Sequence, residues 1–309
     1  MSGGCGSLQP YGAFFLLIHM LGVVNVGGGG VLRNAPIGVM DSGIGGLTVI
    51  KEIWRQLPRE SIVFYGDSLR CPYGDRTPDD IRMLSFQILD FLVAQGVKML
   101  VIACNTATAI ILDEARKRYD IPVLGVIAPG ARAAIAATSN QKIGIIGTQA
   151  TINSKSYSKS LRQTHHGMEI VSQACPKFVD LVEHGLLDEE EALPIVSDSL
   201  QPFRGTDIDT MILGCTHYPL LAPLIAKVLG PDVRLISSAE ETARDISHWL
   251  TEEHLNRLEL DDPKHVFYTS GDVSRFAQIG EAWLQQPIQV MYHDVWGKET
   301  EMRILGDRS

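Results

Sequence analysis

Positive charge is scarce in this chain of 309 residues. Lysine and arginine together number 27 against 36 aspartate and glutamate residues, which gives a formal net charge of -9 at pH 7. An acidic protein has no general attraction to a phosphate backbone. The composition therefore argues against nucleic acid as a partner or substrate.

Cysteine is also sparse, and the five cysteines are odd in number and contain no C-x-x-C pair. This spacing excludes a disulfide framework and a zinc knuckle. We therefore expect free thiols in a reducing, cytoplasmic setting. The cysteines are Cys5, Cys71, Cys104, Cys175 and Cys215.

A long hydrophobic run is missing as well. The apolar stretch from Ala13 to Val24 is shorter than the roughly 20 residues that a membrane-spanning helix needs. No lysine or arginine precedes Arg33, so the charged start of a secretory signal is absent. With the glycine tract at Gly27 to Gly30, this composition predicts a flexible extension over residues 1–35 and no association with a membrane.

From Ile37 onward, short apolar runs alternate with amphipathic stretches. Such runs are typical of parallel strands that are buried on both faces. Between them, Leu47 to Leu57 has apolar residues at helical spacing, and Pro219 to Gly230 has a favoured helix start and stop. We therefore predict an α/β fold with mainly parallel sheets in three layers. The predicted strands are 37–40, 62–65, 99–103, 123–126, 143–146, 210–213, 233–236 and 266–268.

A weak internal repeat refines this fold prediction. The strand that ends at Cys104 resembles the strand that ends at Cys215, and the run 37–40 resembles 143–146 at nearly the same spacing. Two matches at one spacing indicate two similar halves, related by a pseudo-twofold axis. We expect these halves to face each other across a cleft, with one thiol on each side.

The first motif that could bind a ligand or take part in a reaction runs from Asp41 to Gly46, between a predicted strand and a predicted helix. Its glycines allow the backbone to approach a ligand, and the helix N-terminus favours an anion. A dinucleotide site is poorly supported because Thr48 stands where the fingerprint requires its third glycine. The alternative is a tight turn in which Asp41 or Ser42 acts only as a helix cap.

The second motif, Cys104-Asn105-Thr106, lies at a strand end and a helix start. The field of a helix N-terminus should lower the pKa of the Cys104 thiol toward neutrality. Asn105 and Thr106 add groups that can hold an amino or carboxylate group. A buried, inert cysteine is the alternative interpretation.

The third motif contains Cys215, Thr216 and His217, again at a helix entrance. The histidine is close enough in sequence to tune the thiol or to supply a proton. Three alternatives stay open: a structural histidine, the nucleophile and base of a cysteine hydrolase, and a metal site made by Cys104, Cys215 and His217.

Lesser features lie in loops and at helix ends. Tyr73 and Gly74 follow another strand and are expected to border the cleft. Cys71 and Cys175 each precede a proline and are interpreted as packing or surface thiols. Glu183, taken alone, is typical of an ordinary carboxylate at a helix end.

Two equivalent thiols suit a reaction that has two faces. One thiolate removes a proton from a stereocentre, and the opposite thiol returns a proton from the other side. The sequence shows no phosphate-binding signature and no obvious Schiff-base lysine, so we expect no pyridoxal phosphate. The carbanion must then be stabilised by hydrogen bonds and positioned charge.

At these motifs the chain resembles the glutamate racemases of the cofactor-independent aspartate/glutamate racemase superfamily. The resemblance extends over about residues 36–293. The stretches that carry it are Ile37 to Leu47, Tyr65 to Asp67, Cys71 to Gly74, Val101 to Ala109 and Leu213 to Pro219.

The resemblance implies interconversion of L-glutamate and D-glutamate, without a cofactor or metal, to supply D-glutamate for peptidoglycan. It implies that Cys104 and Cys215 are the two bases, paired with D-glutamate and L-glutamate respectively. Assistance in proton transfer is assigned to Asp41, Glu183 and His217. Substrate binding is assigned to Asp41, Ser42, Tyr73, Gly74, Asn105, Thr106, Thr216 and His217.

The resemblance further implies a cytoplasmic homodimer whose chains each contain two α/β domains, the second inserted in the first. We expect residues 36–128 plus 239–295 in the first domain, residues 129–238 in the second, and a tail at 296–309. The rival functions are an aspartate racemase, a hydantoin racemase, a maleate isomerase, and an amino-acid-binding protein without turnover.

Overall fold

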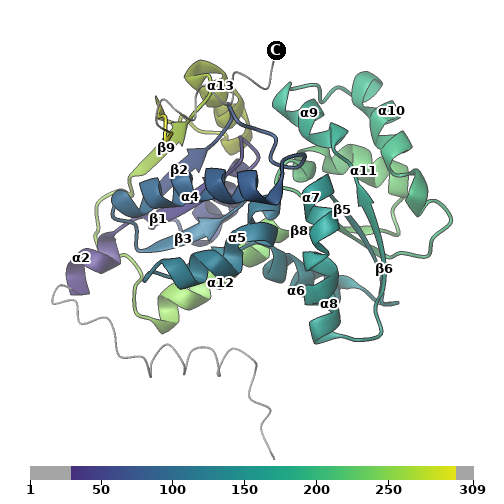
Figure 1. Cartoon of the computed structure of the whole chain (residues 1–309), viewed down its shortest axis with the longest axis horizontal. Helices are drawn as coiled ribbons and strands as arrows, with labels where there is room; N and C mark the ends of the chain where they lie inside the picture. Colours follow the sequence, from purple (N-terminus) through teal and green to yellow (C-terminus); the bar gives the residue numbers. More distant parts are fainter. Residues whose placement is uncertain (1–28, 297–309) are drawn as a thin grey trace, which may run out of the picture.

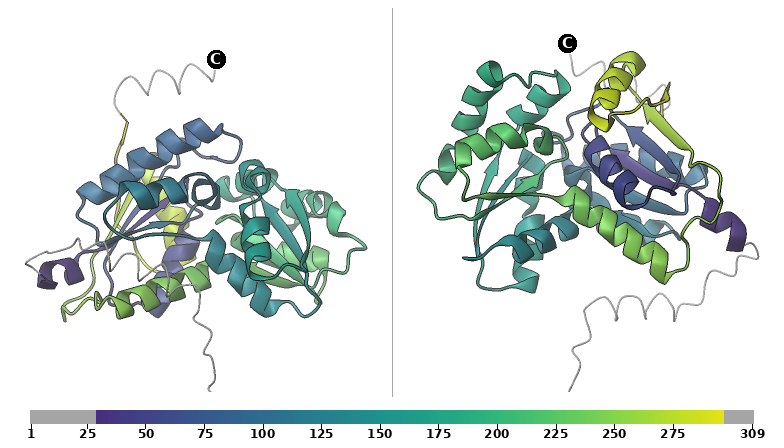
Figure 2. Two further views of the ribbon diagram at one scale, coloured as in Figure 1. Left: turned by 60° about the horizontal axis from the view of Figure 1, so that its bottom comes forward. Right: turned by 180° about the vertical axis from the view of Figure 1, so that it is seen from behind.

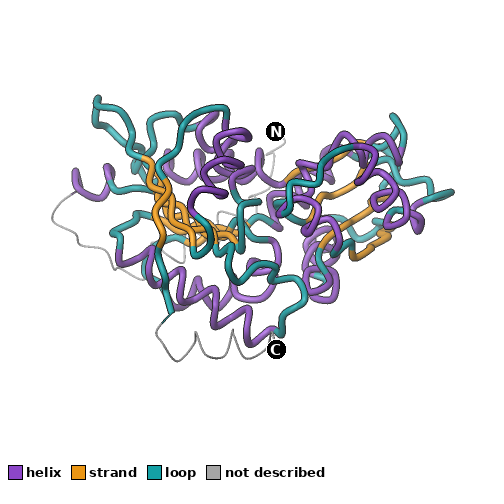
Figure 3. The backbone as a smooth tube through the Cα atoms, turned by 90° about the horizontal axis from the view of Figure 1, so that it is seen from above, coloured by secondary structure: helices purple, strands orange, loops and turns teal. Residues whose placement is uncertain are grey.

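The computed structural model describes residues 29–296, which form two parallel β-sheets with helices on both faces (Figures 1 and 3). The six-stranded sheet has the order β10-β9-β2-β1-β3-β4, and the four-stranded sheet has the order β6-β5-β7-β8. The strands are β1 Ile37–Asp41, β2 Ile62–Gly66, β3 Met99–Ile102, β4 Val123–Gly125, β5 Lys142–Gly147, β6 Glu169–Ala174, β7 Thr210–Gly214, β8 Arg234–Ser237, β9 His265–Thr269 and β10 Val290–Tyr292.

The helices cover the sheets because successive strand residues point to opposite faces. In β1, Val39 packs in the apolar cluster under α3, α12 and α13, whereas Met40 packs in the cluster under α4 and α5. The larger sheet is thus the middle of three layers. The helices are α2 Gly29–Asn34, α3 Leu47–Gln56, α4 Pro78–Ala94, α5 Asn105–Arg118, α6 Ile127–Ala137, α7 Gln149–Ser154, α8 Ser156–Thr164, α9 Lys177–Glu183, α10 Glu189–Ser199, η1 Gln201–Phe203, η2 Tyr218–Leu221, α11 Ala222–Leu229, α12 Ser238–Glu252 and α13 Val273–Leu284.

The predicted α/β fold is confirmed, and each of the eight expected strands is present. Two further strands, β6 and β10, lie at sheet edges and were not predicted. The side chains of β6 are only partly buried or exposed, so this strand lacks the continuous apolar run of a central strand. β10 has three residues, which is too short for a recognisable pattern.

The helix expected from Pro219 to Gly230 is divided in the structure. The 3-10 turn η2 precedes α11, and Pro223 lies in the first turn of α11. Proline has no backbone N–H, so it suits the start of a new helix better than the interior of a longer one.

The two sheets repeat one topology, as the internal repeat predicted. β1 to β4 are arranged 2-1-3-4, and β5 to β8 are arranged 6-5-7-8 in the same sense. The strand order changes direction between β1 and β3 in one sheet and between β5 and β7 in the other. Ligands of open α/β sheets bind at such reversals, beyond the carboxyl ends of the strands.

Helix α12 joins the two halves (Figure 2, right). It follows β8 of the smaller sheet and packs against both α3 and α6. Its Asp245 pairs with Arg132 of α6 at 2.6 Å, and the Glu240 carbonyl accepts a hydrogen bond from Gln56 of α3. The predicted domain bounds near residues 128 and 238 remain a prediction, and α12 is where the chain returns to the larger sheet.

The expected flexible extension requires a correction at its end. Residues 29–34 form α2, and the Arg33 carbonyl accepts a hydrogen bond from the buried Lys98 ammonium at 2.8 Å. Residues 1–28 and the tail from 297 to 309 lie outside the described residues. Within residues 29–296, no helix has the length and apolar character needed to cross a membrane.

Candidate active site

Carboxyl ends of strands from both sheets supply the predicted catalytic groups. Asp41 is the last residue of β1, Cys104 follows β3, and Cys215 follows β7. The three residues are 0%, 4% and 6% exposed. The charge of Cys215 contributes to the pKa of Cys104, so the two thiols share one electrostatic environment.

The Asp41 carboxylate connects the two halves. It accepts hydrogen bonds from the backbone N–H groups of Gly43 and Gly46, at 3.2 and 2.9 Å. It also accepts one from the Thr216 hydroxyl at 3.2 Å, across from the smaller sheet. Burial raises the pKa of Asp41 to about 6, although His217 and the two N–H groups oppose the shift.

Cys104 caps the N-terminus of α5, where its Sγ accepts the Ala107 N–H at 3.4 Å. The thiol donates a hydrogen bond to Ser42 Oγ at 3.4 Å. The prediction of a lowered pKa is wrong, because burial raises the pKa of Cys104 to about 12 and the nearby Asp41 adds to the increase. The hydrogen bonds with Ser42 and Ala107 do lower the pKa of Cys104, as expected, but the increase caused by desolvation is larger.

Cys215 lies in a chain of contacts with His217 and Glu183. Its Sγ is 3.6 Å from His217 Nδ1, and His217 Nε2 is 2.6 Å from Glu183 Oε1. Burial alone would lower the pKa of His217, but hydrogen bonding to Cys215, Cys71 and Glu183 raises it well above its usual value. Burial favours a neutral Glu183, yet His217 outweighs this effect and lowers the Glu183 pKa. A cationic imidazole therefore lies beside the Cys215 sulfur and stabilises negative charge there.

Two substrate-binding candidates, Asn105 and Thr106, belong to a buried polar cluster. Asn105 Oδ1 accepts the Tyr157 hydroxyl at 2.6 Å, but its Nδ2 is buried without a partner. The Thr106 hydroxyl contacts those of Thr148 at 2.8 Å and Thr151 at 3.2 Å. The buried amide donor is available to an anion. A buried donor that makes no hydrogen bond costs free energy.

Tyr73 and Gly74 approach the cluster from the loop after β2. The Tyr73 hydroxyl donates to the Asp67 carboxylate, so this tyrosine is anchored within the larger half. A Cβ atom at Gly74 would lie 2.6 Å from the Thr148 Cβ. The absence of a side chain at Gly74 thus lets the two halves touch.

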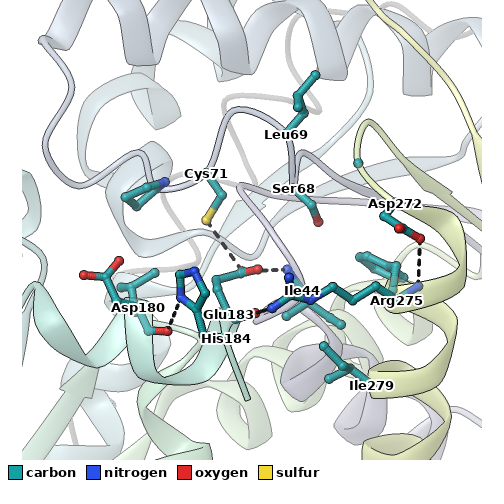
Figure 4. A pocket seen from close by; sticks show the side chains of 14 residues that line it. Ile44, Ser68, Leu69, Cys71, Asp180, Glu183, His184, Asp272, Arg275 and Ile279 are labelled. Atoms are coloured by element: carbon teal, nitrogen blue, oxygen red, sulfur yellow. Dashed lines mark hydrogen bonds between the residues drawn. The ribbon is translucent and has the colours of Figure 1, made fainter. Parts of the chain in front are cut away.

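Several contacts at the site carried no recognisable sequence signal. Tyr157, Thr148 and Thr151 come from α7, α8 and the loop before them, where hydroxyl groups are common and form no motif. Cys71 was interpreted as a packing or surface thiol, but its Sγ donates to Glu183 Oε1 at 3.5 Å beside a surface pocket (Figure 4). Cys175 packs in the core of the smaller half, as expected of a packing thiol.

Comparisons with known proteins agree with this arrangement. The model of the Asp/Glu/Hydantoin racemase family matches residues 37–246. A glutamate racemase of Exiguobacterium sibiricum is 51% identical over 83% of this chain and 94% of its own length.

Solved structures are similar as well. The crystal structure of a glutamate racemase isoform of Bacillus anthracis has a TM-score of 0.81 and 47% identity, covering 85% of this chain and 98% of that chain. A glutamate racemase of Francisella tularensis, solved in complex with D-glutamate, has a TM-score of 0.79 and 35% identity at the same coverage, 85% and 98%.

The pairing of Glu183 with His217 predicts a pH-dependent contribution to stability. A lowered Glu183 pKa stabilises the fold above the unfolded value of about 4.3, and a raised His217 pKa stabilises it below about 6.5. Glu183→Gln should therefore reduce the free energy of unfolding by about 1.5–3 kcal/mol between these limits. The loss should shrink as the pH rises above about 6.5, through the folded pKa of His217.

Urea unfolding of both proteins at pH 5.5 and pH 8.5 measures this difference. Glu114→Gln is the matched control, because Glu114 is half exposed and pairs with Arg82 on the surface. Its effect should be small at both pH values. An equal loss for Glu183→Gln at both pH values would contradict the assigned ion pair.

Proposed function

The chain belongs to the Asp/Glu/hydantoin racemase family, and we propose that it interconverts L-glutamate and D-glutamate by moving the α-proton between two thiols. The observation that supports this mechanism most is the equivalence of Cys104 and Cys215. Cys104 follows β3 and Cys215 follows β7, the third strands of two four-strand units with the same topology. Asp41 accepts a hydrogen bond from Thr216, next to Cys215, and its charge affects the pKa of Cys104. A hydrolase or a binding protein has no need of a second thiol at the equivalent position.

The two thiols have different electrostatic surroundings. Cys104 is a thiol at neutral pH because burial raises its pKa to about 12. Cys215 has the His217 imidazole against its sulfur, and that imidazole is hydrogen-bonded to Glu183. The substrate-free enzyme is thus prepared for L-glutamate, with Cys215 as the base and Cys104 as the acid on the opposite face.

The carbanion formed between the two thiols needs stabilisation from fixed groups. The Asn105 amide without a partner and the N-terminus of α5 both favour negative charge, and both are buried. The Thr106 hydroxyl lies in the same buried cluster, and Thr216 holds the Asp41 carboxylate on the other side of the site. These groups bind the substrate carboxylates, while Ser42, Tyr73 and Gly74 shape the surrounding space. In this proposal no metal or organic cofactor takes part.

We also propose the cellular setting that the family implies. The product, D-glutamate, is a component of peptidoglycan, and the reaction takes place in the cytoplasm. The active form is a homodimer, which sedimentation equilibrium of the purified chain would measure directly. A monomer at working concentrations would contradict this assembly.

The activity itself is tested with purified protein, L-glutamate and no added cofactor. Chiral chromatography should show D-glutamate approaching the amount of L-glutamate, because the enantiomers have equal free energy in solution. L-Aspartate under the same conditions should react far more slowly. Equal or faster turnover of aspartate would favour the rival aspartate racemase.

Single cysteine variants test which thiol acts on which enantiomer of glutamate. Cys104→Ala should lower racemisation by about 100-fold or more, yet still exchange the α-proton of L-glutamate with deuterated water, because Cys215 can remove and return it on one face. Cys215→Ala should show the same exchange only with D-glutamate. Proton NMR at the α-carbon measures both rates.

Cys175→Ala is the matched control for loss of a thiol, since Cys175 is buried in the core of the smaller half. It should keep the turnover of the unmodified protein. Near-full racemisation by either Cys104→Ala or Cys215→Ala would refute the mechanism.

A further inference from the structure

Beside the active site, three groups with metal-ligating atoms converge. One ligand atom from each of Cys71, Glu183 and His217 lies within 4.8 Å of the others. They come from separate elements: Cys71 from the loop after β2, Glu183 from the end of α9, and His217 from the start of η2. Cys71 thus has a chemical environment that its sequence context did not indicate.

The geometry points to a binding site for a borderline-soft divalent ion, and we propose that Cys71 Sγ, Glu183 Oε1 and His217 Nε2 bind Zn²⁺ and thereby inhibit the enzyme. Thiolate, imidazole and carboxylate are the three ligand types that zinc takes in proteins. A site with three protein ligands keeps its fourth position open for water.

The existing distances are close to those that zinc requires. In a tetrahedral site, ligand atoms about 2.0–2.3 Å from the metal are separated by roughly 3.3–3.5 Å. Cys71 Sγ and Glu183 Oε1 are already 3.5 Å apart. His217 Nε2 and Glu183 Oε1 are 2.6 Å apart, so the side chains must separate by about 0.7 Å for an ion to enter.

A pocket reaches two of the three groups. Cys71 and Glu183 line a pocket of about 390 Å³, and their side chains point toward one another in Figure 4. Asp180 and Asp272 also line the pocket, and Arg275 is the one lysine or arginine among its lining residues. The negative balance favours entry of a cation.

Gly43 leaves space on the inner side of the cluster. A Cβ atom there would overlap Glu183 Oε1 and lie 3.0 Å from Cys71 Sγ. The backbone N–H of the next residue, Ile44, donates to Glu183 Oε1 at 3.3 Å and orients the carboxylate. Such support of a ligand strengthens a metal site.

Binding of the ion must balance protons and charge. The Cys71 thiol and the Nε2 position of His217 each release a proton to water in the pocket, and Glu183 is already ionised. Zn²⁺ with one thiolate, one carboxylate and a neutral imidazole has no net charge, as does the cluster before binding, but His217 has lost its positive charge. His217 is then no longer a protonated imidazole beside Cys215, and racemisation stops.

Binding is measured with Co²⁺ as a spectroscopic probe, in the Cys104→Ala/Cys215→Ala protein. Those variants remove the competing catalytic thiols and cannot racemise, so the result is independent of the proposed function. A thiolate-to-cobalt charge-transfer band should appear, and Zn²⁺ should displace it. Adding Cys71→Ala should abolish the band, whereas adding Cys175→Ala or Cys5→Ser should leave it unchanged.

Inhibition is measured in the chain with both catalytic thiols. Zn²⁺ should inhibit reversibly, with recovery on chelation, and Cys71→Ala should raise the inhibitory concentration at least about tenfold. Thermal unfolding checks that Cys71→Ala is folded, and calorimetry with Zn²⁺ reports binding if this variant has little activity. A cobalt band that survives Cys71→Ala, or Zn²⁺ binding by calorimetry that is unchanged by it, would overturn the proposal.

Discussion

The Asp41 carboxylate at the end of β1 is the contact on which the site depends. It holds the glycine turn of the larger half through Gly43 and Gly46 and accepts the Thr216 hydroxyl from the smaller half. A buried carboxylate is costly unless it is hydrogen-bonded, so these donors must all be in place. Because the donors come from both halves, satisfying Asp41 also fixes how the two strand ends meet.

The burial that this contact requires also makes the two thiols unequal. Desolvation and the Asp41 charge keep the Cys104 proton in place. Cys215 has different surroundings, because His217, hydrogen-bonded to Glu183, brings a positive charge to its sulfur. An enzyme with two bases needs one of them protonated and the other not. The proposed mechanism assigns the base for L-glutamate to Cys215, the thiol that lies beside His217.

The sequence was sufficient for the parts of the protein that have strong local patterns. Continuous apolar runs predicted eight of the ten strands that the structure describes, and the cysteine at matching strand ends predicted the repeated topology. β6 could not be predicted because none of its residues is fully buried and its sequence has no continuous apolar run. The pKa of Cys104 could not be predicted either, since helix position is local whereas desolvation depends on how both halves pack. Cys71 does pack against the core of the smaller half, as interpreted, but its contact with Glu183 could not be predicted because the two residues are 112 positions apart in the chain.

The central claim is that the proton removed from one face and the proton returned to the other belong to different thiols. The most direct measurement follows the unmodified protein converting L-glutamate in deuterated water at early times, before the reverse reaction matters. Two bases predict that the D-glutamate formed carries deuterium at the α-carbon while the remaining L-glutamate carries almost none. D-Glutamate that retains the original proton would show that a single group carries it between the faces, and would contradict the account.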